Sequence, residues 1–337
     1  MAEEFNNFFT SIGEKISGSI QATNSAPLTY LNDQRPPDFS LQEINGGEIL
    51  AIIKTLEPKC SVDIYGICPK LIKFIDTAIC MPLGFIYNLS IKEGVFPDKL
   101  KLSRVVPIFK SGARNDCNNY RPIALISTFS KIFEKIVAIK LTNHIELNKL
   151  LSPNQFGFQK GLSTEHCILH LHNYISEALN NNKYAIGIFL DLQKAFDVVN
   201  HNVLLLKLEK MGIKGLALDW FRSYLSERRQ KVDLGGSNST EKNINMSVMQ
   251  GSVLGPLLFL IFINDLPNAS VILKLLLFAD DTCALDSDTD INRLISRVNN
   301  ELQKIANWFV INKISVNVSK CKYIIFKKTK IQYPGKH

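Results

Sequence analysis

The feature that most constrains the fold of this chain is a pair of short apolar runs that each lead into aspartate. Residues 184–190 (YAIGIFL) precede Asp191, and residues 272–278 (ILKLLLF) precede, after one alanine, Asp280 and Asp281. Apolar runs of this length between polar residues are typical of buried strands. Carboxylates are almost never fully buried unless they are paired or bound to metal. The sequence therefore predicts two core strands whose ends carry aspartate.

The remaining segments alternate between helical and strand patterns. Apolar residues recur with the helical period at 130–151, and the stretch 104–109 has the composition of a strand. Further helices are expected at the start of residues 1–35, across 40–95, twice within 204–225, and at 254–266 and 291–309, and further strands at 323–326 and in hairpins of 230–232 with 244–248 and of 272–278 with 282–285. Because the hairpins argue against an all-parallel sheet, an α+β architecture fits best.

The bulk composition restricts the class of protein. Of the 337 residues, 46% are hydrophobic and 21% are charged, a balance typical of folded globular proteins and not of disordered chains. The formal net charge of +8 favours an anionic partner, nucleic acid first, because Lys and Arg neutralise phosphates and release counterions.

Cysteine usage and the apolar segments indicate an intracellular protein without a membrane anchor. The seven cysteines include no CxxC pair, so neither a disulfide framework nor a zinc ribbon is predicted. The N-terminal stretch has no basic region leading into an apolar one, so it is not a signal peptide. The most apolar run, 253–263, contains Pro256 and is too short to span a bilayer.

Adjacent carboxylates in a hairpin turn repel each other, and a divalent cation relieves that repulsion. Mg²⁺ prefers hard oxygen ligands such as carboxylates, phosphates and water. Two such ions about 3.5–4 Å apart can serve phosphoryl transfer, and Asp191 with Asp280 and Asp281 would suit them. The alternative is that Asp280 and Asp281 form an ordinary polar turn, since aspartate is common in turns.

Three sequence boxes carry a family resemblance. Residues 189–197 read FLDLQKAFD with His201 close behind, residues 250–259 read QGSVLGPLLF, and residues 278–282 read FADDT. Boxes of this kind, in this order, resemble those of the reverse transcriptases of LINE-type, non-LTR retrotransposons such as the jockey group. The resemblance is strong over roughly residues 95–326 of this chain.

The resemblance implies a polymerase right-hand fold with an RRM-like sheet in the palm. Residues 1–94 would be a helical N-terminal extension and linker, and 95–337 the reverse transcriptase domain, with the fingers at about 95–183 and the palm at about 184–326. The chain ends shortly after the last expected palm strand, so the thumb is expected to be missing. The endonuclease and thumb domains of the parent element would then be encoded elsewhere or lost.

The same resemblance implies the catalytic residues of a nucleotidyltransferase. Asp191, Asp280 and Asp281, together with Leu192, would bind two Mg²⁺ ions, with Mn²⁺ as an expected substitute. Lys320, in the segment NVSKCK, matches the lysine that is proposed to protonate the leaving pyrophosphate. The alternative for Lys320 is an ordinary surface lysine.

A further set of residues is implied to bind the incoming nucleotide. Lys110 and Arg121, from the segments IFKSG and NYRPI, would grip the triphosphate, since cations suit a polyanion. Phe196 would exclude the 2′-hydroxyl of ribonucleotides, and its alternative is a core phenylalanine. Gln250 would contact the sugar, and Gly251 would let the backbone approach closely.

Residues 155–164 read QFGFQKGLST and resemble the box of the family that lies near the template. Gln155, Gly157 and Lys160 would therefore bind the template. Gln159 stands where the family usually has arginine, and Lys160 would compensate for the missing positive charge.

These residues predict an RNA-directed DNA polymerase that adds dNTPs to the 3′-hydroxyl of a DNA primer on an RNA template. No membrane partner is expected, and the enzyme would act in the nucleus. The alternative is a truncated, inactive retroelement remnant that at most binds nucleic acid. An RNA-dependent RNA polymerase is disfavoured by Ala279, in place of glycine before the aspartate pair, and by the bulky Phe196.

Overall fold

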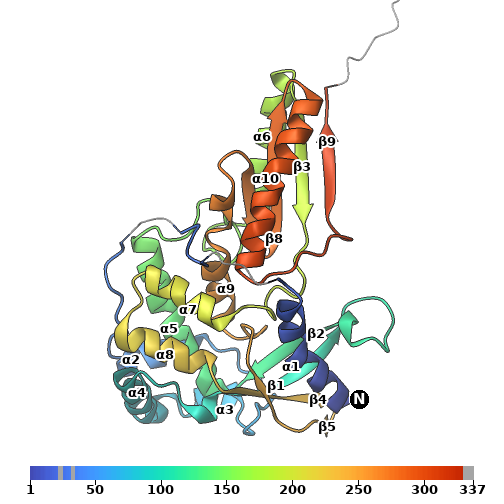
Figure 1. The fold of residues 1–337 in the computed structure, drawn as a ribbon. Coiled ribbons are helices and arrows are strands. Elements are labelled where there is room, and N and C mark those ends of the chain that lie inside the picture. The colour runs from blue at the N-terminus through green and yellow to red at the C-terminus, as the bar shows by residue number, and fades with distance from the viewer. Residues whose placement is uncertain (22–25, 32–34, 329–337) are drawn as a thin grey trace, which may run out of the picture. The chain divides into compact units, whose positions relative to one another are not determined.

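The computed structural model describes residues 1–21, 26–31 and 35–328 and divides into two compact units (Figure 1). Both units combine helices with sheets, as the sequence predicts. Each unit is assembled from separate stretches of chain, so residues far apart in the sequence are neighbours within it. Of the described residues, unit 1 comprises 1–21, 35–151 and 194–263, and unit 2 comprises 26–31, 152–193 and 264–328.

The sheet of unit 2 has the strand order β7-β8-β3-β9, and every neighbouring pair is antiparallel. Helices α6 and α10 pack beside this sheet, as Figure 1 shows. The strand predicted at 184–190 and the hairpin predicted at 272–285 are confirmed, with Asp281 already in the second strand. The elements are α6 (Thr164–Asn180), β3 (Tyr184–Leu190), the 3-10 helix η3 (Leu266–Ala269), β7 (Lys274–Phe278), β8 (Asp281–Asp288), α10 (Ile291–Ile311) and β9 (Lys322–Phe326).

Strand β3 lies inside this sheet because its apolar residues, Ala185 to Ile188, are buried in succession on both faces. Helix α10 is attached to β8 by ion pairs. Arg297 Nε lies 2.7 Å from Asp286 Oδ2, and Arg297 Nη1 lies 2.8 Å from Asp288 Oδ2. Both carboxylates are buried, and pairing offsets the cost of removing them from water.

The sheet of unit 1 follows the order β2-β1-β4-β5, with β6 also paired to β4. Strands β1 (Leu102–Phe109) and β2 (Tyr120–Ile126) form an antiparallel hairpin, and β1 runs parallel to β4 (Arg228–Leu234). Strands β5 (Ser237–Asn238) and β6 (Lys242–Ile244) are antiparallel to β4. The strand predicted at 104–109 is thus confirmed and is two residues longer.

The hairpin predicted around Gly235 and Gly236 forms, but its returning strand differs from the prediction. The sequence pattern places that strand at 244–248, whereas the structure places β5 and β6 earlier in the chain. The backbone N–H of Val248 donates to the carbonyl of Phe196 at 2.9 Å. Because this stretch bonds to a distant loop, it leaves the sheet after β6.

The helices of unit 1 surround an aromatic core. Trp220 is fully buried, and its ring centroid lies 5.3 Å from that of Phe96 and 5.2 Å from that of Phe133. The predicted helices are confirmed, with the last of them shorter than the pattern suggests. They are α1 (Ala2–Gly18), α2 (Gly46–Thr55), α3 (Pro69–Phe74), α4 (Asp76–Glu93), α5 (Thr128–Leu147), α7 (His201–Lys210), α8 (Gly215–Leu225) and α9 (Gly255–Ile263), with the 3-10 helices η1 (Asp98–Leu100) and η2 (Cys117–Asn119).

Helix α1 packs onto strands β4 to β6 of unit 1. Asn6 is fully buried; its Nδ2 donates to Ser239 Oγ at 2.9 Å, and its Oδ1 accepts from Gln230 Nε2 at 2.9 Å. Phe5 and Phe9 join the same apolar cluster as Val105. The N-terminal helix is therefore part of the core of unit 1. Across the described ranges, no helix is both long and apolar enough to cross a membrane.

Candidate functional site

The β7–β8 hairpin of unit 2 reverses direction through two residues. Phe278 pairs with Asp281, so Ala279 and Asp280 form the turn. Ala279 has a φ of +57°, in the left-handed region that L residues enter only at a cost. The favoured two-residue hairpin turns need a positive φ at one or both of their residues, and here Ala279 supplies it. The turn therefore holds Asp280 and Asp281 next to each other at one end of the sheet.

Asp191 lies beside this turn. Strand β3 pairs with β8 up to Leu190, which is opposite Thr282, and continuing the register by one residue sets Asp191 opposite Asp281. Directly opposed residues of antiparallel strands have Cβ atoms about 5 Å apart. Three predicted catalytic residues, Asp191, Asp280 and Asp281, thus come to the same end of one sheet.

The loop between α10 and β9 fixes the backbone that follows β3. The N–H of Asn317 donates to the carbonyl of Asp191 at 2.7 Å. The next residue, Leu192, is buried and forms a bridge with Val316. Lys320 belongs to the same loop, and its N–H donates to the carbonyl of Asn317 at 2.9 Å. Its side chain is exposed.

The chemistry of the three carboxylates fits the predicted metal, because Mg²⁺ prefers carboxylate oxygens. Asp281 is exposed, and Asp191 and Asp280 are half-buried, so a cation can approach them. Within the described residues, however, no group of three or more His, Cys, Asp or Glu side chains is gathered closely enough to hold an ion. The metal site therefore stays a prediction.

Two of the predicted template residues contact the same turn from within unit 2. Gln155 is only 2% exposed, and its Oε1 accepts from the N–H of Gly157 at 2.8 Å and from the N–H of Ala279 at 2.9 Å. A Cβ on Gly157 would lie 2.3 Å from the Ala279 nitrogen, so only glycine allows this approach. Lys160, in contrast, is exposed.

In unit 1, the predicted triphosphate-binding residues share one face of the β1–β2 hairpin. Ile108 pairs with Arg121, and the N–H of Lys110 donates to the carbonyl of Asn119 at 2.8 Å. If the register is extended through that bond, Lys110 lies opposite Asn119. Since Asn119 and Arg121 are two residues apart on the same strand, Lys110 and Arg121 are diagonal neighbours on one face of the hairpin. Both cationic side chains are exposed, so they are available to an anion.

Gln250 and Gly251 lie directly against strand β2. The N–H of Ala124 donates to the carbonyl of Gln250 at 2.7 Å. Gly251 has a φ of +106°, and a Cβ there would lie 2.5 Å from the Ala124 carbonyl oxygen. Gly251 thus brings the loop backbone close to β2, and its predicted role at the nucleotide stays a prediction.

Phe196 packs against the core of unit 1. Its ring stacks on that of Phe259, with centroids 4.5 Å apart and an interplanar angle of 17°. The side chain is half-buried, so it combines a packing role with access to the surface. Its role in sugar selection stays a prediction.

Asp197 is a residue that the sequence reasoning missed as a site candidate. It is 9% exposed, and its Oδ1 accepts from Gln250 Nε2 at 3.2 Å. Burial raises the pKa of the Asp197 carboxyl to about 6, against the opposing effects of Lys194 and Gln250. The sequence feature that could have pointed to Asp197 is its position in the box FLDLQKAFD, where it is the second aspartate and follows Phe196.

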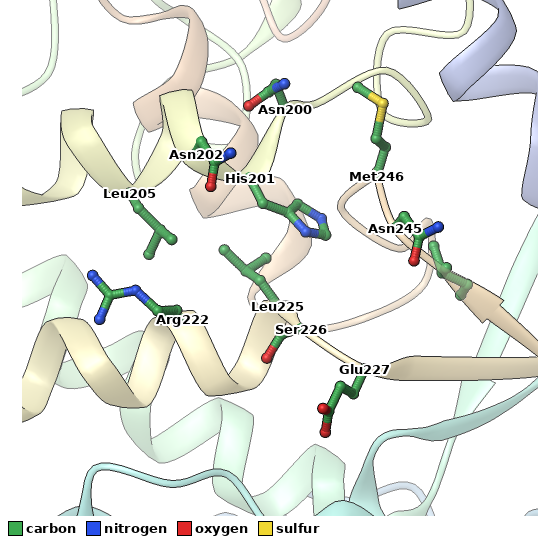
Figure 2. Close-up of a pocket in the computed structure, with 11 residues that line it drawn as sticks. Asn200, His201, Asn202, Leu205, Arg222, Leu225, Ser226, Glu227, Asn245 and Met246 are labelled. Carbon is green, nitrogen blue, oxygen red and sulfur yellow. The ribbon is translucent and has the colours of Figure 1, made fainter.

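A cavity of about 260 Å³ in unit 1 lies between α7, α8 and the segment that carries Asn245 and Met246 (Figure 2). His201 lines it, and its Nε2 lies 2.8 Å from the carbonyl oxygen of Ser247. Burial lowers the pKa of the His201 imidazole, which favours the neutral ring. His201 therefore anchors the segment that leads to Gln250.

Comparisons with known proteins identify the family. Residues 108–337 match the reverse transcriptases (RNA-dependent DNA polymerases), and the chain belongs to this family. It is 33% identical over 276 residues to the probable RNA-directed DNA polymerase from transposon BS of Drosophila melanogaster, a match that covers 80% of the chain and 30% of the relative. The RNA-directed DNA polymerase from mobile element jockey of the same species is 31% identical over 274 residues, which are 79% of the chain and 30% of the relative.

More distant relatives come from other mobile elements. The Pol polyprotein of the type-1 retrotransposable element R1 of Bradysia coprophila is 28% identical over 250 residues, or 73% of the chain and 24% of the relative. The resemblance drawn from the three sequence boxes is thus confirmed. The chain spans less than a third of the length of these relatives.

Proposed function

We propose that this chain carries the polymerase active site of an RNA-directed DNA polymerase from a non-LTR retrotransposon. Its reaction would join a dNTP to the 3′-hydroxyl of a DNA primer that is paired with an RNA template. The observation that carries the proposal is the placement of Asp191, Asp280 and Asp281 at one end of the unit 2 sheet. Membership of the reverse transcriptase family supports it.

Asp191, Asp280, Asp281 and the backbone at Leu192 would hold two Mg²⁺ ions, which Mn²⁺ could replace. When bound, such ions lower the pKa of an attacking hydroxyl and stabilise the charge of the leaving group. The β7–β8 turn and the loop that bonds to Asp191 would keep the carboxylates in place. Exposed Lys320, in that loop, would give a proton to the departing pyrophosphate.

The predicted nucleotide-binding residues of unit 1 support the same reaction. Exposed Lys110 and Arg121 would neutralise the triphosphate. Gln250, oriented by Asp197, would bind the sugar, and Phe196 would exclude a 2′-hydroxyl. Each of these side chains would act on the substrate by binding or exclusion.

The antiparallel order β7-β8-β3-β9, with a helix between β8 and β9, supports an RRM-like palm sheet of a right-hand polymerase. The fingers would occupy about 95–183 and the palm about 184–326, after an N-terminal extension at 1–94. Lys160 would contact the template.

One observation favours a second candidate, a chain that binds nucleic acid without polymerising. It is the formal net charge of +8, which suits binding to a polyanion whether or not catalysis occurs. The two candidates differ in a primer-extension assay with an RNA template, a DNA primer, dNTPs and Mg²⁺. The polymerase proposal predicts extension by the wild-type chain.

The matched variants in this assay are Asp280→Asn and Glu177→Gln. Both remove one negative charge from unit 2, but Glu177 is exposed on α6, away from the turn. Extension should be lost in Asp280→Asn and kept in Glu177→Gln. Primer–template binding without extension by the wild-type chain would support the second candidate instead.

A further inference from the structure

The segment 154–157 runs along strand β7 of unit 2 and ends at the aspartate turn. The N–H of Leu277 donates to the carbonyl of Asn154, and the N–H of Phe156 donates to the carbonyl of Leu277, both at 2.8 Å. These bonds make a short parallel bridge between Gln155 and Leu277. The segment is therefore held in register with the strand that leads to Asp280.

The side chain of Gln155 is directed into the protein. With 2% of its surface exposed, it has almost no area to offer to a template. Its Oε1 accepts two backbone N–H groups, those of Gly157 and Ala279, and its Nε2 lies 3.5 Å from the Ala279 carbonyl oxygen. Both ends of the carboxamide thus face the backbone of the turn.

Ala279 needs such a contact for two reasons. Its φ of +57° lies in the left-handed region, which is unfavourable for an L residue. It is also 6% exposed, and a buried N–H without an acceptor is costly. Gln155 supplies the acceptor, and Gly157 leaves the space, since a Cβ there would collide with the Ala279 nitrogen.

We propose that Gln155 is a positioning residue of the polymerase site and not a template contact. Its side-chain oxygen holds Ala279 in the left-handed conformation and thereby sets the direction of the Asp280 and Asp281 side chains. The inference rests on the proposed function of that aspartate pair, because it assigns Gln155 a role through them.

Three substitutions separate positioning from template binding. Gln155→Met has a similar shape and lacks the accepting oxygen, whereas Gln155→Glu keeps an acceptor at the same place. Lys160→Met removes an exposed cation from the same segment and leaves the turn untouched. A thermal melt of each variant establishes that it is folded.

The first measurement is hydrogen exchange of the peptide that covers 275–283, followed by mass spectrometry. Losing the acceptor for a buried amide should speed exchange at Ala279 about tenfold or more in Gln155→Met. Gln155→Glu should restore slow exchange, and Lys160→Met should leave it unchanged. Unchanged exchange in a folded Gln155→Met chain would overturn the proposal.

The second measurement compares binding with turnover. Gln155→Met should keep the wild-type Kd for an RNA–DNA primer–template, measured by fluorescence anisotropy, and lower kcat about tenfold or more at saturating primer–template. Lys160→Met, which removes an exposed cation from the same segment, should weaken binding and raise the Kd. A raised Kd with an unchanged kcat in Gln155→Met would show template contact and contradict the proposal.

The two measurements also separate this inference from the proposed function. If the wild-type chain does not extend a primer, the polymerase proposal fails while the exchange experiment still decides whether Gln155 holds the turn. If the chain extends a primer and exchange does not respond to Gln155→Met, only the positioning role is wrong.

Discussion

Replacing Gly251 by alanine tests whether the loop of the box QGSVLGPLLF must press against strand β2. The new Cβ would lie 2.5 Å from the Ala124 carbonyl oxygen, so β2 or the loop has to move. That movement also threatens the 2.7 Å bond from the Ala124 N–H to the Gln250 carbonyl. Gly251→Ala should therefore damage both stability and nucleotide binding.

Gly236→Ala is the matched control. Gly236 has a φ of +104°, close to the +106° of Gly251, but a Cβ there meets no atom within 4 Å. The backbone strain, about 1–3 kcal/mol for an L residue in such a conformation, is common to both variants. The collision at Gly251 adds about 1–3 kcal/mol. The difference between the two variants measures the contact with β2.

The assay is urea unfolding in a Trp308→Phe background, which leaves Trp220 of unit 1 as the fluorescent reporter. Gly251→Ala should lower the free energy of unfolding by about 1–3 kcal/mol more than Gly236→Ala does. In primer extension, it should raise the KM for dNTP, whereas Gly236→Ala should not. Equal losses of stability and equal KM values would refute the reasoning.

Three further predictions follow from single residues. Burial raises the pKa of Asp197 from 3.8 to about 6. Between these two pH values the folded chain keeps a proton on Asp197 that the unfolded chain has released, so the free energy of unfolding falls as the pH rises from 3.8 to about 6. Asp197→Asn should remove this fall and exceed wild-type stability at pH 8 by up to about 3 kcal/mol in urea unfolding, with no excess below pH 4. Phe196→Val should raise rNTP incorporation relative to dNTP about tenfold or more in primer extension, and an unchanged ratio would exclude the predicted sugar selection. Lys160→Met should reduce the slope of log Kd against log salt for primer–template by about 1, and an unchanged slope would remove Lys160 from the template-binding residues.

Local patterns in the sequence were sufficient to predict most of the main elements, but not helix α6 or strand β2. The apolar run of β3 and the hairpin of β7 and β8 were found because burial on a sheet leaves a continuous local signal. Helix α5 was predicted because its apolar residues recur on one face with the helical period. The structure buries these residues, which are Ile132, Phe133, Ile136, Val137 and Leu141. The aspartates at the strand ends followed from the same runs.

Features that depend on long-range bonds were not predictable in this way. The inward-facing carboxamide of Gln155 is fixed by Ala279, which lies 124 positions away. The chain leaves the sheet after β6 because the N–H of Val248 donates to the carbonyl of Phe196 and not to a neighbouring strand. Asp197 gains its raised pKa from burial under distant segments. Neither periodicity nor a local motif encodes such contacts.

Asp191, Asp280 and Asp281 are proposed to form one metal-dependent site. The most direct measurement is the affinity for Mn²⁺, by electron paramagnetic resonance, of the wild-type chain, Asp191→Asn, Asp281→Asn and the double variant. If Asp191 and Asp281 serve one site, each single substitution weakens Mn²⁺ binding. The loss of binding free energy in the double variant is then smaller than the sum of the two single losses. Wild-type affinity in either single variant, or fully additive losses in the double variant, would contradict a shared site.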